Sequence, residues 1–345
     1  MLATQVMEWE SGIVYPDGYR HDSSLDGLKE RLAKAEKFVL DPQACVMAAG
    51  VALSRPSSIL AALEFARLPF EPFWIEFANA DVRSAMASLG SPLLPQPNTE
   101  VTIERAGFLI RTEGEELAIE YVHADRTPSG MKAVDQSPVR GRFSLKGLSE
   151  SGRALLEIFA PAGGTAPKIA GGRVQDHIKL LHTSPKEAAA DMELRGRFST
   201  TRNPDVARVR KHIVGYHGED GVRVMEERQG EEMYRLFSLQ VLPALILLNC
   251  RNAVSPERVP APEKLNRQRA KKGRPPIPEH VLVKIHLSPE RRAERHAAGG
   301  SRASARGGLV IGHFKVRKSG VWWWSPHWRG SVDGKTPERT YVLTR

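Results

Sequence analysis

Apolar residues recur in the first third of the chain with two periods, one helical and one extended. Apolar residues recur at helical spacing over 25–38, directly after Ser24, which can cap a helix. This pattern predicts an amphipathic helix. Two apolar stretches fill 41–68, and Pro56 is placed to begin the second of them as a helix. The aromatic and β-branched residues of 69–77 follow a proline-controlled turn and predict a strand.

The two clearest patterns of the central region are a hairpin and a buried helix. Two alternating runs in 101–122 meet around Gly114, which is typical of a β-hairpin. The run 231–249 is almost entirely apolar towards its end and predicts a buried helix. Because proline lacks an amide hydrogen, Pro243 should kink this helix or split it in two.

The remaining central segments are polar or rich in glycine and proline. The stretch 187–225 is polar and mixed, and it suggests only short strands at 193–199 and 222–225. The composition of 91–98 is typical of a linker, and that of 162–172 is typical of a loop or a domain boundary.

The last third of the chain predicts a small antiparallel sheet. Its candidate strands are 281–287, 309–318, 321–328 and 340–344, with an arginine-, alanine- and glycine-rich segment at 288–308. The whole pattern predicts an α+β protein. We expect a mixed domain with the hairpin over 1–160, a middle region over 173–253 that ends in the apolar helix, and a basic antiparallel β domain over 264–345.

Composition narrows the class of protein. With 41% hydrophobic and 26% charged residues, the 345-residue chain is neither disordered nor fibrous. Two distant cysteines, Cys45 and Cys250, exclude both a disulfide framework and a cysteine-based zinc site, and they favour a reducing cytoplasm. The first ten residues carry no signal-peptide pattern, and the most apolar run, 241–248, is too short to span a bilayer. We therefore expect a soluble protein with no membrane partner.

The net charge of +10 is concentrated at one end of the chain. The last 91 residues hold 20 Lys and Arg against 7 Asp and Glu, whereas the first 254 residues are close to neutral. Such asymmetry indicates a polyanionic partner for the C-terminal region.

The densest basic feature is the predicted hairpin 312–330, GHFKVRKSGVWWWSPHWRG, with its turn at 318–320. Side chains alternate between the two faces of a strand. One face should therefore hold cations, two histidines and a tryptophan, namely His313, Lys315, Arg317, Trp323, His327 and Arg329. The opposite face should be apolar, with Phe314, Val316, Trp322 and Trp324.

This polar face has two functional interpretations beside a purely structural one. Cations neutralise phosphates and an exposed tryptophan stacks on bases, which favours nucleic-acid binding. Alternatively, His313 and His327 are the acid–base pair of a metal-independent ribonuclease, with Lys315 and Arg329 as the phosphate clamp and Tyr341 as a helper. A solvated face of a basic domain would also look like this.

A second basic run lies at 264–280, KLNRQRAKKGRPPIPEH. Five of its cations fall within eight residues, namely Arg267, Arg269, Lys271, Lys272 and Arg274. A short helix that ends in a glycine and two prolines can lie along a phosphate backbone, although such runs also occur in solvated connectors.

The other histidines give weaker signals. Asp176, His177 and His182 fall near one another in the sequence, as do His123 and Asp125, and His212 and His217. None has the helical spacing of a zinc motif with a third ligand nearby, so we expect surface or structural roles and predict neither a metal nor a cofactor.

Several segments together resemble a family of uncharacterised proteins from tailed phages and prophages. They are RLPFEPFWIEF (67–77), LLNCRNAV (247–254), KLNRQRAKKGRPPIPEHVLVKI (264–285), the hairpin 312–330 and the closing RTYVLTR. Members of that family similarly combine a "RAKxGKPP" stretch with a "GHF…W…PHxRG" element. The resemblance implies a bacterial host cell and a phage setting, and it implies no catalytic residues.

The first hypothesis is a non-enzymatic protein that binds DNA or RNA through phosphates. The expected contact residues are Arg267, Arg269, Lys271, Lys272, Arg274, His313, Lys315, Arg317, Trp323, His327 and Arg329. The second is the ribonuclease, and the third is a phage assembly or host-takeover factor whose basic region docks an acidic protein.

Overall fold

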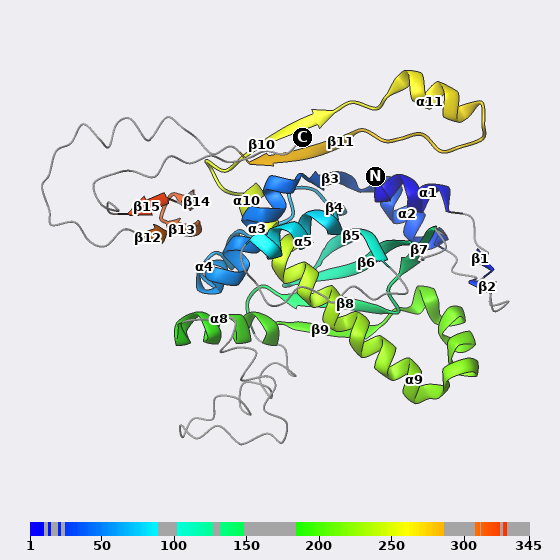
Figure 1. The fold of residues 1–345 in the computed structure, drawn as a ribbon, viewed down its shortest axis with the longest axis horizontal. Helices are drawn as coiled ribbons and strands as arrows, with labels where there is room; N and C mark the ends of the chain where they lie inside the picture. Colours follow the sequence, from blue (N-terminus) through cyan, green and yellow to red (C-terminus); the bar gives the residue numbers. More distant parts are fainter. Residues whose placement is uncertain are drawn as a thin grey trace, which may run out of the picture.

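A nine-stranded mixed sheet forms the centre of the molecule (Figure 1). The structure, a computed structural model, describes residues 1–9, 13–14, 20–21, 25–88, 102–126, 132–147, 184–285, 308–310, 312–324 and 327–329. The strands run in the order β10 (Val254–Val259), β11 (His280–Ile285), β3 (Glu36–Leu40), β4 (Phe73–Ala78), β5 (Thr102–Glu113), β6 (Glu116–Arg126), β8 (Val139–Ser144) and β9 (Phe198–Arg202), and β7 (Lys132–Gln136) also pairs with β6. β3 is parallel to both β11 and β4, and the other pairs are antiparallel.

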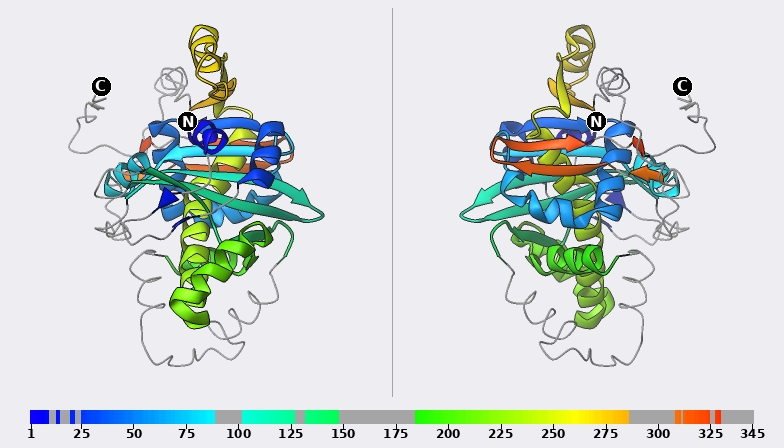
Figure 2. Two further views of the ribbon diagram at one scale, coloured as in Figure 1. Left: turned by 90° about the vertical axis from the view of Figure 1, so that its right-hand side faces the viewer. Right: turned by 90° about the vertical axis from the view of Figure 1, so that its left-hand side faces the viewer.

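Helices cover the two faces of this sheet unequally (Figures 1 and 2). The described helices are α1 (Leu2–Glu8), α2 (Asp26–Lys34), α3 (Pro42–Ser54), α4 (Pro56–Ala61), η1 (Leu63–Phe65), α5 (Asn79–Ser88), α8 (Pro185–Gly196), η2 (Pro204–Val206), α9 (Ala207–Leu236), the π-helix η3 (Phe237–Val241), α10 (Leu242–Leu248) and α11 (Glu263–Ala270). The larger core lies on the face covered by α3, η3 and α10, and the smaller core holds α1 and α2 against Trp74 and Leu109.

The expected helix at 25–38 is correct only as far as Lys34. Ala35 has extended backbone angles, and β3 begins at the next residue. Phe38 and Leu40 of β3 are buried in the larger core, so the sheet outcompetes continuation of the helix. The other expectations for this region are confirmed, because Pro56 begins α4 and 73–78 forms a buried strand of the sheet.

The predicted hairpin around Gly114 is confirmed as β5 and β6. Glu113 pairs with Glu116, which leaves a two-residue turn, and Gly114 has a φ of +64° that other residues adopt only with strain. The two strands pair along almost their whole length, so they set the register of the middle of the sheet.

The predicted buried helix at 231–249 is also confirmed, together with its interruption near Pro243. α9 continues into the π-helix η3, and Pro243 lies in the first turn of α10. A π-helical turn is a known way to accommodate a break in regular helical hydrogen bonding. The segment is buried against the sheet, where the ring of Phe237 packs at a tilted angle against those of Phe108 and Phe143.

Three strand predictions are wrong in detail. Residues 222–225 lie within α9, and 193–196 belong to α8, with β9 following only at 198–202. The segment 281–287 does not start a separate sheet, because β11 pairs in parallel with β3 of the large one. Burial of Val281 and Val283 in the larger core explains this placement.

The α+β class and a small antiparallel sheet near the C-terminus are confirmed. β13 (His313–Arg317) pairs with β14 (Gly320–Trp324), and β12 (Gly308–Val310) pairs with β15 (His327–Arg329). A further small pair, β1 (Ile13–Val14) with β2 (Arg20–His21), lies near α1. The predicted segments 91–98, 162–172, 288–307 and 340–344 lie outside the described residues.

Two findings bear on the expectations drawn from the cysteines and from the most apolar run of the chain. Cys45 and Cys250 are buried free thiols, and burial raises the pKa of both. In the part of the chain that the structure describes, no helix has both the length and the apolar character that crossing a membrane requires.

Candidate functional site

The basic run 264–280 forms the end of an arm that extends the large sheet. In the arm, β10 pairs with β11 from Val254 opposite Ile285 to Val259 opposite His280. α11 lies in the connection between the two strands, at the tip of the arm. Figures 1 and 2 show α11 at the edge of the molecule, above α1. The short basic helix and the turn that follows it are therefore confirmed.

Side-chain hydrogen bonds close the tip of the arm on itself. The side-chain amide of Asn266 donates to the carbonyl oxygen of Ile277 at 2.9 Å and accepts from the N–H of Ile277 at 2.8 Å. Arg269 donates to the Pro275 carbonyl at 2.9 Å and forms an ion pair with Glu8 of α1. These bonds hold the turn through Gly273, whose φ is +64°, against the helix.

Of the five predicted contact residues of the arm, two form ion pairs with described residues and three do not. The side chain of Arg269 is only 14% exposed and is used in holding the arm to α1. Arg267 is well exposed and lies 3.9 Å from Glu263, a surface pair worth little energy. Lys271, Lys272 and Arg274 are exposed and form no ion pair with any residue that the structure describes.

The second predicted site, the hairpin of β13 and β14, has the expected turn but the opposite arrangement of tryptophans. The register pairs Phe314 with Trp323, and side chains paired in this way share a face. Trp323 is 3% exposed and its ring lies 5.3 Å from that of Phe314. The expectation that Trp323 joins the cations is therefore wrong, because the register places Trp322 and Trp324 there instead.

Trp323 is also where the hairpin is fixed to the body. Asn252 accepts from the Trp323 N–H at 2.8 Å and donates to its carbonyl at 2.9 Å. The N–H of Phe314 lies 3.4 Å from the hydroxyl of Ser58 in α4. With Val321, these aromatic residues belong to the larger core, so the hairpin packs on the same core as the sheet.

The solvent side of the hairpin carries His313, Lys315 and two tryptophans. Lys315 Nζ lies 4.2 Å from the centre of the Trp324 ring, a cation–π distance, and the His313 ring lies 5.7 Å from it. Arg317 is exposed near the turn. This face is basic as expected, but Lys315 already occupies one face of the tryptophan that a base would stack on.

The structure does not pair the two strands of the proposed ribonuclease site. β13, which carries His313, pairs with β14, whereas β15, which carries His327 and Arg329, pairs with β12. The side chains of His327 and Arg329 lie outside the described residues, as does Tyr341. The convergence of the two imidazoles therefore stays a prediction.

A third group, on β6 and β7, shows chemistry that sequence spacing did not reveal. Because side chains alternate along a strand, His123 and Asp125 lie on the same face of β6. Asp135 of β7 lies directly opposite His123. One donor atom from each lies within 4.8 Å of the others. His123 and Asp125 are close in the sequence, whereas Asp135 joins them only through a strand pairing that spacing alone does not show.

The electrostatics of this group are unusual for a buried site. His123 is 6% exposed, and its Nε2 lies 3.2 Å from Asp125 Oδ2. Burial alone lowers the pKa of an imidazole, but Asp125, with help from Asp135 and Glu232, outweighs it and raises the pKa of His123 to about 9. The imidazole is therefore cationic at neutral pH and paired with a carboxylate.

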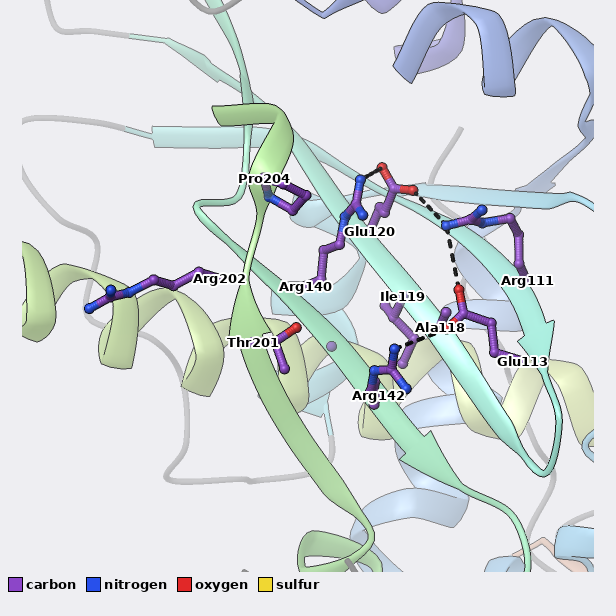
Figure 3. A pocket seen from close by; sticks show the side chains of 11 residues that line it. Arg111, Glu113, Ala118, Ile119, Glu120, Arg140, Arg142, Thr201, Arg202 and Pro204 are labelled. Carbon is purple, nitrogen blue, oxygen red and sulfur yellow. Dashed lines mark hydrogen bonds and ion pairs between the residues drawn. The ribbon is translucent and has the colours of Figure 1, made fainter. Parts of the chain in front are cut away.

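A pocket of about 100 Å³ lies on the opposite face of β5, β6, β8 and β9 (Figure 3). Its arginines are matched by carboxylates. Arg142 pairs with Glu113 at 3.1 Å, and Arg111 lies 3.4 Å from the buried Glu120. Arg140 extends the network to Asp205 at 2.8 Å. Matched charges of this kind cover an open sheet face and do not favour an anionic ligand.

The predicted basic residues thus lie in two places, the arm and the hairpin, at opposite ends of the molecule in Figure 1. The arm presents three neighbouring cations, Lys271, Lys272 and Arg274, that are exposed and form no ion pair with a described residue. At the hairpin turn, Arg317 and Lys318 are exposed and unpaired in the same sense. Comparison of the chain with family models, with curated proteins and with solved structures found no match.

Proposed function

We propose that the chain is a phage- or prophage-type protein that binds nucleic acid through the basic arm formed by β10, α11 and β11. The observation that carries this proposal is the group of Lys271, Lys272 and Arg274 at the tip of the arm, exposed and without ion-pair partners in the described chain. Cations that are not neutralised by neighbouring carboxylates are the groups that replace counterions on a phosphate backbone.

The composition of the arm supports the same conclusion. Residues 258–279 contain seven Lys and Arg and two Glu. The two glutamates lie beside Arg267 and Arg258, at 3.9 and 2.8 Å. Neither glutamate forms an ion pair with Lys271, Lys272 or Arg274 among the described contacts.

The internal bonds of the arm bear on affinity. Asn266 and Arg269 fix the turn before any partner arrives. A loop that is already ordered loses less conformational entropy on binding, so more of the phosphate attraction is available as affinity. Contacts of this kind position a protein on nucleic acid without reading its sequence, so we expect weak sequence preference.

The hairpin is a less favourable primary contact. Its two partly exposed tryptophans, Trp322 and Trp324, would suit single-stranded bases, but Lys315 covers one of these rings. We therefore assign the hairpin a secondary role in binding. The ribonuclease is not the function proposed, because β13 and β15 belong to different strand pairs.

The test compares two variants that lose the same charge. The arm variant is Lys271→Gln/Lys272→Gln/Arg274→Gln. The control, Lys186→Gln/Lys211→Gln/Arg228→Gln, removes three exposed cations from α8 and α9. Fluorescence anisotropy at 50 mM salt with a duplex and a single strand of DNA and with RNA should show at least a tenfold loss of affinity for the arm variant and less than threefold for the control.

Equal losses in both variants would mean that only the overall charge matters, and would overturn the assignment to the arm. Absence of binding to all three probes at 50 mM salt would overturn the nucleic-acid proposal itself. In that case, co-purification of an acidic protein that the arm variant fails to retain would favour the interaction factor instead.

A further inference from the structure

The group on β6 and β7, in which His123 and Asp125 are buried and Asp135 is half-buried, has the composition of a metal site. Strand alternation places His123 and Asp125 on the same face of β6, and the register puts Asp135 opposite His123. Side chains directly opposite in an antiparallel pair have Cβ atoms only about 5 Å apart. Backbone pairing, rather than flexible loops, therefore sets the separation of the three donors.

We propose that His123, Asp125 and Asp135 bind one divalent transition-metal ion, with water completing its coordination. Their donor atoms lie within 4.8 Å of one another. Neighbouring ligands of a tetrahedral zinc ion are separated by roughly 3.4 Å, since each bond is about 2.1 Å. Side-chain rotations that move the donors together by about 1 Å would therefore bring all three within bonding distance.

Unsatisfied polar atoms point independently to a missing ligand. His123 Nδ1 and Asp125 Oδ1 are buried and have no hydrogen-bond partner among the described residues. His123 is 6% and Asp125 is 8% exposed, so bulk water does not readily satisfy these atoms. Buried polar groups nearly always have a partner, and a hydrated cation would supply one to both side chains.

The surrounding charge also favours a dication. Asp125 and Asp135 supply two carboxylates to the group. Glu232 of α9 brings a third carboxylate near it, because it accepts at 3.4 Å from Tyr121, whose ring lies 5.3 Å from that of His123. A divalent ion would neutralise negative charge gathered in this way.

The donor types indicate which metal is preferred. One imidazole with two carboxylates suits zinc, manganese or iron, whereas magnesium and calcium prefer oxygen ligands alone. Three protein ligands leave positions for water. Because the ion would join β6 to β7, we expect its clearest effect to be a gain in stability, which is independent of nucleic-acid binding by the arm.

The experiment uses the full chain without a polyhistidine tag, stripped with EDTA and dialysed. Calorimetric titration with zinc or manganese chloride should show one site per chain, at least tenfold tighter than magnesium or calcium. Thermal unfolding should shift upward by several degrees when the ion is added. Asp135→Asn and His123→Gln should each weaken binding by at least tenfold.

Glu116→Gln is the matched control, because it removes a carboxylate from the same strand on the opposite face, 3.2 Å from Arg142. It should bind the metal as the wild type does. A folded wild-type chain that binds neither zinc nor manganese at millimolar concentration would overturn the proposal, and so would a folded Asp135→Asn that binds with unchanged affinity. Should the variants not fold, the wild-type titration decides alone.

Discussion

Glu76 illustrates how one buried carboxylate organises its surroundings. Its oxygens accept from the N–H groups of Leu2 and Ala3, both at 2.8 Å, from Trp74 Nε1 at 3.0 Å and from Arg105 at 2.9 Å. The side chain is completely buried. It thus satisfies amides at the start of α1, which no side chain of that helix caps, and attaches the helix to β4.

Replacing Glu76 with alanine should destabilise the protein by about 3–5 kcal/mol, because Arg105 and two amides lose their buried acceptor. Urea unfolding followed by circular dichroism measures the change. Glu116→Ala serves as the comparison, since its side chain is 37% exposed and should change the free energy of unfolding by about 1 kcal/mol or less. Similar effects for both would contradict this role.

Gly107 tests the packing of the smaller core in the same way. A Cβ at this position would lie 2.3 Å from Trp74 Cζ2 and 2.9 Å from Leu2 Cδ2. Gly107→Ala should therefore cost about 1–3 kcal/mol by overpacking. At Gly147 a Cβ meets nothing within 4 Å, so Gly147→Ala should be close to neutral in the same unfolding assay. If Gly147→Ala destabilised the protein more than Gly107→Ala, the packing described around Trp74 would be contradicted.

At the scale of elements, local patterns and long-range pairing had different predictive value. The hairpin of β5 and β6 and the break at Pro243 depend on neighbouring residues, and both were predictable. β3 and β11 are strands because each pairs with a distant segment, which periodicity does not show. Similarly, Asp135 becomes a third donor only through the pairing of β6 with β7, and the face of Trp323 depends on a register set by the turn.

The hairpin of β13 and β14 should open independently when its attachment is weakened. Asn252→Ala removes both hydrogen bonds to the Trp323 backbone. At about 1 kcal/mol for each bond, amide hydrogen exchange in 313–324 should become roughly 30-fold faster. Hydrogen-exchange mass spectrometry measures this, with β5 and β6 as the internal reference. Equal acceleration in those central strands would indicate global destabilisation and contradict local docking.

At the scale of the whole molecule, the distribution of charge is the feature most relevant to function. The first 254 residues are nearly neutral, and on the sheet face of Figure 3 each arginine of the network lies beside a carboxylate. The excess positive charge is placed on the arm and the hairpin, at opposite ends of Figure 1. Composition predicted the excess, and the structure shows that Lys271, Lys272 and Arg274 at the tip of the arm are exposed and form no ion pair with a described residue.

The salt dependence of nucleic-acid binding tests the central claim most directly. Each phosphate contact contributes about 0.9 to the slope of log K against log salt for duplex DNA. If Lys271, Lys272 and Arg274 each neutralise one phosphate, the slope for Lys271→Gln/Lys272→Gln/Arg274→Gln should be shallower than that of the wild type by about 2.7. Parallel lines for the two proteins would show that the tip of the arm makes no phosphate contacts and would contradict the account.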